Sequence, residues 1–134
     1  MANITPHAIR LLPGQDLKLE IQKYVDENQL KAGWISACVG SLTEYHIRFA
    51  NQSNRTNGQG HFEIVSLSGT ISINGSHLHI VISDSEGKCI GGHLLAGNII
   101  YTTAEIMILE SDDFEFKREK EGTTNWNELQ IHRR

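Results

Sequence analysis

Residues 75–95 read GSHLHIVISDSEGKCIGGHLL, and this stretch predicts a β-hairpin that gathers three histidines. Residues two apart in a strand point the same way, about 7 Å apart, so His77 and His79 share one surface. Gly87 suits the left-handed backbone position that closes a three-residue loop. A loop that ends at Gly87 places His93 directly opposite His79, with side chains about 5 Å apart.

The length of the loop leaves a second register open. A four-residue loop would instead set His79 against Gly92. The apolar residues favour the shorter loop, because it places Ile82 opposite Ile90 within one continuous apolar surface, whereas a slip of one residue mixes the two faces. We therefore expect the three imidazoles to share one surface of the hairpin.

The segments outside the hairpin predict one helix among short strands. The helix is expected from about Asp16 to Asn28, where Asp16 is a suitable N-cap and apolar residues recur at helical spacing. Residues 51–60 are polar and contain glycine, which indicates a loop, and Asn74-Gly75 is typical of a hairpin turn. Alternating patterns predict strands over residues 7–12, 34–39, 44–50, 61–73, 99–110 and 114–118.

The tail, which contains Trp126, Leu129 and Ile131, fits either a short helix or a strand that docks on a neighbour. Six or seven strands with one substantial helix and short links indicate an α+β domain with a mainly antiparallel sheet. At 134 residues, we expect the range 1–134 to form a single domain.

Composition and net charge indicate the cellular compartment and the classes of binding partner to expect. Two cysteines are too few for a disulfide framework, and the sequence shows neither a membrane span nor a signal-peptide pattern, so we expect a cytoplasmic protein without membrane contact. The formal net charge is −4, whereas domains that bind duplex DNA are usually basic. The charge therefore counts against direct DNA binding by the whole surface.

Three imidazoles on one surface suit a divalent metal such as zinc, with a fourth position left for water or substrate. The sequence supplies no adjacent carboxylate to complete the ligand set. The alternative is a metal-free polar pocket, or a contact between subunits, in which His77, His79 and His93 are neutral and hydrogen-bonded.

Glu105 is the acidic residue to test beside this site. It stands within the apolar run 104–108, where a strand does not normally bury an unpaired charge. It fits a metal ligand, a group that orients a histidine, or a general base. A hydrogen bond to backbone or histidine, or a solvent-facing position, would explain it equally well.

Several motifs together resemble those of a known family. The segment 60–71, GHFEIVSLSGTI, is similar to the Gly-Arg-Phe-Glu-Ile-Leu segment of the PPC (plants and prokaryotes conserved) domain, with His61 where the family has arginine. The likeness continues through RLLPGQDL at 10–17, GSL at 40–42, HLH at 77–79, GGHL at 91–94 and AE at 104–105.

The resemblance implies a compact antiparallel sheet packed on one main helix and a homotrimer. It also implies association with DNA or with DNA-associated proteins, because the domain occurs in plant AT-hook nuclear proteins. The AT-hook itself is built on Arg-Gly-Arg-Pro, and this chain lacks that tetrapeptide.

Two functions from different classes follow. The first is a cytoplasmic homotrimeric PPC-domain protein that acts as a DNA-binding or regulatory module, with a histidine-lined pocket able to hold a divalent metal. The second is a metal-dependent enzyme or small-molecule binder in which His77, His79 and His93 hold the metal and Glu105 acts as the base.

Overall fold

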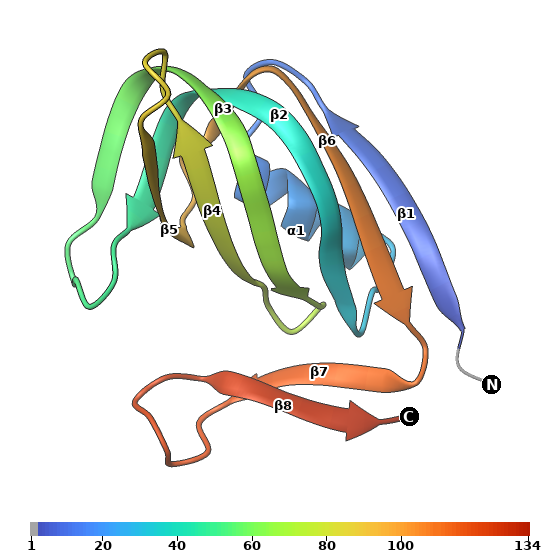
Figure 1. Ribbon diagram of the computed structural model, residues 1–134. Coiled ribbons are helices and arrows are strands. Elements are labelled where there is room, and N and C mark those ends of the chain that lie inside the picture. The colour runs from blue at the N-terminus through green and yellow to red at the C-terminus, as the bar shows by residue number, and fades with distance from the viewer. Residues whose placement is uncertain (1–2) are drawn as a thin grey trace.

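The computed structural model describes residues 3–134 (Figure 1). This range contains one helix and eight strands. In chain order they are β1 (Ile4–Leu11), α1 (Leu17–Glu27), β2 (Gly33–Arg48), β3 (Thr56–Ile71), β4 (His77–Ser83), β5 (Cys89–Leu94), β6 (Ile99–Ser111), β7 (Phe114–Glu119) and β8 (Glu128–Arg133). The predicted α+β class with a mainly antiparallel sheet is confirmed.

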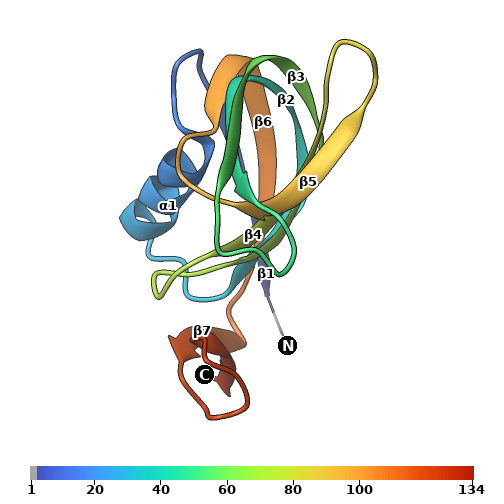
Figure 2. The same ribbon diagram turned by 90° about the vertical axis from the view of Figure 1, so that its left-hand side faces the viewer.

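Helix α1 begins and ends where the sequence predicts. The Asp16 carboxylate accepts a hydrogen bond from the backbone N–H of Leu19 and caps the first turn. Leu17, Ile21 and Val25 recur every fourth residue on one stripe and are fully buried. The helix therefore covers the concave side of the main sheet, as Figures 1 and 2 show.

The main sheet has six strands in the order β1-β6-β2-β3-β4-β5, and it curls until β5 also pairs with the end of β2. This second pairing places Arg48 beside His93 and Ile47 beside Leu94. It depends on Gly92, because a Cβ atom at that position would lie 2.5 Å from the carbonyl oxygen of Arg48. The paired glycines of β5 thus serve close strand packing.

The β4–β5 hairpin has the register that the three-residue loop predicts. His79 pairs with His93, and Ile82 pairs with Ile90. The backbone N–H of Asp84 donates to the carbonyl of Lys88 over 2.9 Å, and Gly87 has a φ of 80°. The alternating residues Leu78, Ile80, Ile82 and Leu94 are all buried, so the histidines face outward.

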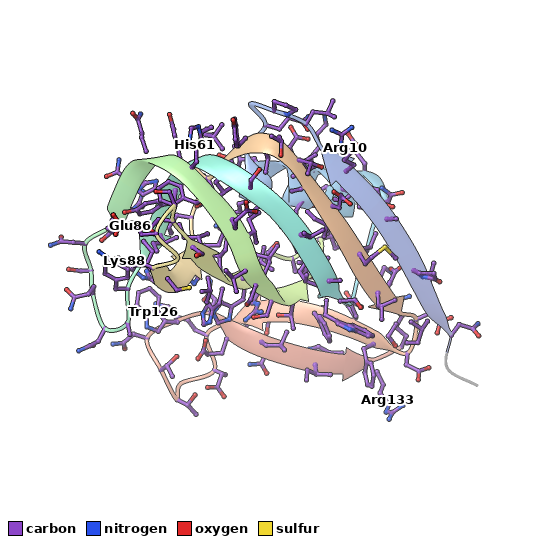
Figure 3. All side chains as sticks on the ribbon, turned by 45° about the horizontal axis from the view of Figure 1, so that its top comes forward. Arg10, His61, Glu86, Lys88, Trp126 and Arg133 are labelled. Carbon is purple, nitrogen blue, oxygen red and sulfur yellow. The ribbon has the colours of Figure 1, made fainter. Side chains whose placement is uncertain are left out.

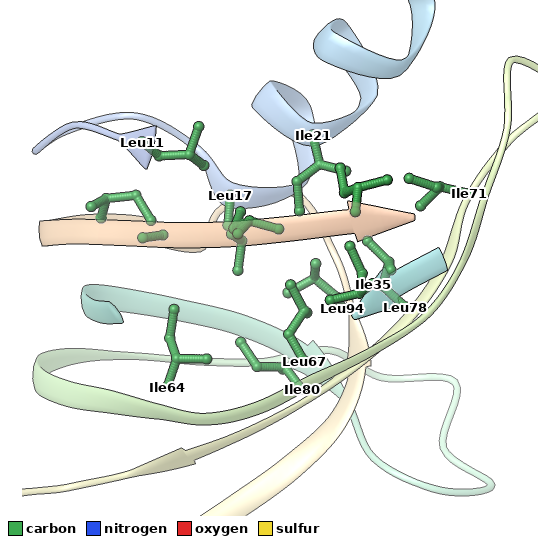
Figure 4. Close-up of a cluster of buried hydrophobic side chains, with 14 of the residues drawn as sticks. Leu11, Leu17, Ile21, Ile35, Ile64, Leu67, Ile71, Leu78, Ile80 and Leu94 are labelled. Atoms are coloured by element: carbon green, nitrogen blue, oxygen red, sulfur yellow. The ribbon is translucent and has the colours of Figure 1, made fainter. Parts of the chain in front are cut away.

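The core fills the space between the curled sheet and the helix (Figure 4). Ile21 from α1 belongs to the same buried cluster as side chains from several strands, among them Ile71, Leu78 and Leu94. The core fixes which face of β4 and β5 points outward, and it thereby fixes the direction of His77, His79 and His93.

The bounds of β2 and β3 differ from those predicted. Residues 33–48 form one bulged strand rather than two, and β3 begins at Thr56, inside the stretch expected to be a loop. The tail adopts the strand alternative, because β8 pairs with β7 in a separate two-stranded sheet. This hairpin lies across one end of the main sheet (Figures 1 and 2). Within residues 3–134, no helix is long and apolar enough to span a membrane.

Candidate metal centre

His77, His79 and His93 lie together on the outer surface of β4 and β5. Their ring centroids are 4.9 Å apart for His77 and His79, 5.4 Å for His77 and His93, and 5.9 Å for His79 and His93. One ring nitrogen from each residue lies within 4.8 Å of the other two. The hairpin thus brings together the three side chains that the sequence singles out.

The surroundings favour the neutral form of two of these rings. Burial, followed by the positive charge of Arg48 and by His77, lowers the pKa of His93 to about 4. Burial, followed by His79 and Arg118, also lowers the pKa of His77. Because a metal binds neutral imidazole, His93 and His77 are ready to accept one at neutral pH without first losing a proton.

The β7–β8 hairpin forms one wall of the space above the histidines. Arg118 on β7 donates from Nη2 to the Oγ1 of Thr70 on β3 over 2.7 Å. Thr70 pairs with His77 across the β3–β4 ladder, so this contact ties the hairpin to the histidine surface. The result is a recess of about 390 Å³, lined by Arg48, Ser76, His77, His93, Arg118, Trp126, Asn127 and Glu128.

A second recess of about 280 Å³ opens on the other side of Arg118. His77 and His79 line it, together with Leu129 of β8 and residues of β3. The C-terminal hairpin therefore lines recesses on two sides of the histidine surface, on which His77 and His79 are exposed.

Glu105 does not join the histidines in this chain. It is exposed on β6, where it pairs with Arg10 of β1 and Val39 of β2, and it lines a separate groove with Cys38. Strands β2 and β3 stand between β6 and β4, a separation of about 14 Å at the usual strand spacing. The solvent-facing alternative is the one that the structure adopts for Glu105.

The groove beside Glu105 has its own titrating group. Burial, followed by the negative charge of Glu105, raises the pKa of the Cys38 thiol to about 11. Cys89, by contrast, is exposed at the start of β5. Both cysteines are free thiols.

Sequence reasoning missed the four charged and aromatic residues around the recess. Arg48 stands at the end of β2, and Arg118, Trp126 and Glu128 belong to the C-terminal hairpin. Each lies far in sequence from the histidines, and no local spacing connects them. The alternating pattern of Phe114 and Phe116, and of Leu129 and Ile131, fits two paired strands and could have predicted the C-terminal hairpin.

Comparisons with known proteins agree with this fold. The chain is 39% identical over 127 residues to a bifunctional protein GlmU from Synechococcus sp. (strain JA-3-3Ab), covering 95% of this chain and 20% of that protein. It is 28% identical to AT-hook motif nuclear-localized protein 8 from Arabidopsis thaliana, covering 90% of this chain and 33% of that protein. The chain thus spans a fifth to a third of the length of these relatives.

Solved structures share the whole fold. A hypothetical protein from Salmonella has a TM-score of 0.97 and 39% identity, with 100% of this chain and 97% of that chain covered. The metal-containing protein AF0104 from Archaeoglobus fulgidus has a TM-score of 0.81 and 22% identity, with 94% and 93% covered. A candidate DNA-binding protein from Bacteroides thetaiotaomicron has a TM-score of 0.77 and 22% identity, with 98% and 97% covered.

Residues 1–112 match the family described as the Plants and Prokaryotes Conserved (PCC) domain, the domain called PPC above. The match includes all three histidines and the whole six-stranded sheet, and only the C-terminal hairpin lies beyond it. The chain therefore belongs to the Plants and Prokaryotes Conserved domain family.

Proposed function

We propose that this protein is a metal-dependent binding module in which His77, His79 and His93 hold one divalent metal such as zinc. The observation that carries the proposal is the convergence of three ring nitrogens within 4.8 Å of one another. The lowered pKa values of His93 and His77 support it, because they keep the two rings neutral. A protein of the same fold, AF0104, is described as metal-containing.

The donor set fits zinc in kind and in number. Ligand nitrogens around a tetrahedral zinc are about 3.3 Å apart at a metal–nitrogen bond of about 2.0–2.1 Å. The imidazoles would therefore draw together, and rotation of exposed side chains allows this. Three protein ligands leave a coordination position free, where a bound metal polarises water or an oxygen ligand. The recess beside His77 and His93 gives a small ligand access to that position.

Elemental analysis of untagged protein tests the metal. We expect about one zinc per chain in the wild type after incubation with zinc and dialysis, and much less in His79→Ala and His93→Ala. His132→Ala is the matched control, because His132 is exposed on β8 and is not part of the cluster. No zinc uptake by folded wild-type protein would leave a metal-free polar pocket as the function of the three rings.

We also propose that the protein assembles as a homotrimer through the outer face of the main sheet. Val39, Val65, Tyr101 and Met107 are exposed on β2, β3 and β6, which is unusual for large apolar side chains on neighbouring strands. Val65→Lys should shift the mass measured by light scattering from three chains to one. A wild-type mass of one chain at micromolar concentration contradicts the trimer.

DNA association is a second candidate function. The description of the Bacteroides structure and the nuclear plant relatives favour it, whereas the net charge of −4 opposes it. A salt titration of binding to mixed-sequence duplex DNA tests whether the protein binds DNA directly. A genuine DNA complex weakens steeply with salt, and absence of binding at low salt removes DNA as a direct partner.

The metal-dependent enzyme requires, in addition to the metal, that Glu105 reach it as the base. Since Glu105 lines a separate groove in one chain, it acts as a base only if a neighbouring protomer carries it to the metal. Glu105→Gln should therefore leave zinc content unchanged. A hydrolytic activity that depends on zinc and is lost in this variant would favour the enzyme.

A further inference from the structure

Two arginines border the recess that opens beside His77 and His93. Arg48 pairs with His93 across the β2–β5 ladder, so the two side chains are direct neighbours about 5 Å apart at Cβ. Arg118 approaches from β7 and is held beside His77 by its 2.7 Å hydrogen bond to Thr70. Both line the same 390 Å³ space.

Both guanidinium groups are held in place by neighbours that leave their charge unbalanced. The Cζ of Arg48 lies 5.5 Å from the centroid of the Trp126 ring, and Arg118 is anchored by a neutral hydroxyl. Among residues 3–134, the ion pairs within 4.0 Å are His7 with Glu110 and Lys88 with Glu86, so neither arginine has an acidic partner.

Glu128 is the carboxylate that lines the recess, and it pairs with neither arginine within 4.0 Å. Two positive charges therefore face one negative charge before any metal is counted. Arg118 is half-buried, and burial lowers its pKa although the negative charge of Glu128 opposes the shift. A partly desolvated guanidinium without a direct salt-bridge partner is a ready partner for an anion.

We propose that this recess binds a small oxyanion, a phosphate or carboxylate group, between Arg48 and Arg118. Guanidinium groups match the planar fork of a carboxylate and the oxygens of a phosphate, and they bind both through charge-assisted hydrogen bonds. The volume suits a small molecule rather than a polymer. The proposed metal would add a third positive centre, and only that addition rests on the metal-binding function proposed above.

Isothermal titration in phosphate-free buffer at low salt tests the proposal with two probes, inorganic phosphate and malonate. Each is added to chelator-treated protein and to zinc-loaded protein. We expect binding by both forms, tighter with zinc, and a loss of about tenfold in affinity for Arg48→Gln and for Arg118→Gln.

Two further variants test whether the charge inside the recess, and not charge elsewhere on the hairpin, sets the affinity for the two probes. Glu128→Gln removes the repelling carboxylate, so the affinity should rise severalfold. Arg133→Gln is the matched control. The Cζ of Arg133 lies 5.2 Å from the centroid of the Phe114 ring, a contact like that of Arg48 with Trp126. Figure 3 shows Arg133 and Trp126 near opposite ends of the C-terminal hairpin, so Arg133 lies away from the recess. Its affinity should equal that of the wild type.

The outcomes separate the two proposals. Binding that depends on the arginines in protein that takes up no zinc supports the oxyanion site and overturns the metal. Equal affinity in wild type, Arg48→Gln and Glu128→Gln overturns the oxyanion site, and these two variants decide the matter even if Arg118→Gln fails to fold. If duplex DNA binds through the arginines while both probes do not, the pair belongs to a nucleic-acid surface and the proposal is overturned.

Discussion

Two surfaces on the outer side of the same sheet differ sharply in chemistry. On β4 and β5 the outward positions carry three imidazoles that converge within 4.8 Å, with two arginines beside them. On β6 and β2 the outward positions carry Glu105 and exposed apolar side chains such as Val39 and Met107.

A reactive side chain in a strand gains its role from its partners across the ladder. His79 has His93 opposite it, whereas Glu105 has Arg10 and Val39. Strand register therefore makes a cluster on one surface and leaves a lone carboxylate on the other.

The largest effect should come from Gly92→Val, which breaks the histidine surface by moving β5. The new Cβ would meet the Arg48 carbonyl oxygen at 2.5 Å, and backbone cannot yield as a flexible side chain can. We expect a loss of about 3 kcal/mol in the free energy of unfolding, measured with urea. Ser85→Ala, in the exposed loop of the same hairpin, should change it by less than about 0.5 kcal/mol. A loss of equal size in both variants would contradict the packing role of Gly92.

The next largest effect is on zinc affinity, measured in one variant from each surface. His93→Ala should weaken zinc binding by at least about 100-fold, or about 2.7 kcal/mol, because one of three ligands is lost. Glu105→Gln should leave zinc affinity unchanged. Competition titration with a chromophoric chelator measures both. A comparable loss in the two variants would mean that Glu105 reaches the metal after all.

The histidine surface was predictable because its determinants are local. The alternation of Leu78, Ile80 and Ile82 sets the face, and Gly87 sets the loop, all within a short stretch of chain. The same holds for α1, whose cap and apolar stripe are adjacent in sequence.

The recess beside the histidines was not predictable, because it depends on contacts between segments that are distant in sequence. Arg118 and Thr70 are 48 residues apart, and Arg48 reaches His93 only after the sheet curls. Glu105 was misleading for another reason. Its apolar neighbours suggested burial, but Ile106 and Ile108 take the inward positions while Glu105 and Met107 face outward.

The smallest expected effect concerns the two thiols, of which Cys89 is exposed on β5 and Cys38 packs against the core from β2. Cys89 is exposed and should react quickly with a disulfide reagent at pH 8, whereas Cys38, whose pKa is raised to about 11, should react slowly. Glu105→Gln should speed the reaction of Cys38, because it removes a charge that raises this pKa. Two equally fast thiols in folded protein would contradict the burial of Cys38.

The same raised pKa has a consequence for stability. The unfolded chain loses the Cys38 proton near pH 9, whereas the folded chain keeps it until about pH 11. Stability from this thiol is therefore fully present below pH 9 and is lost as the pH rises toward 11. Urea unfolding of wild type and Cys38→Ala across this range measures it, and parallel pH profiles would contradict it.

X-ray absorption at the zinc edge, on untagged protein loaded with one equivalent of zinc, tests the metal assignment most directly. We predict an imidazole signature with nitrogen ligands at about 2.0–2.1 Å that is lost in His79→Ala. Sulfur at about 2.3 Å, which would point to Cys89, or a spectrum of hydrated zinc alone would contradict a centre built from His77, His79 and His93.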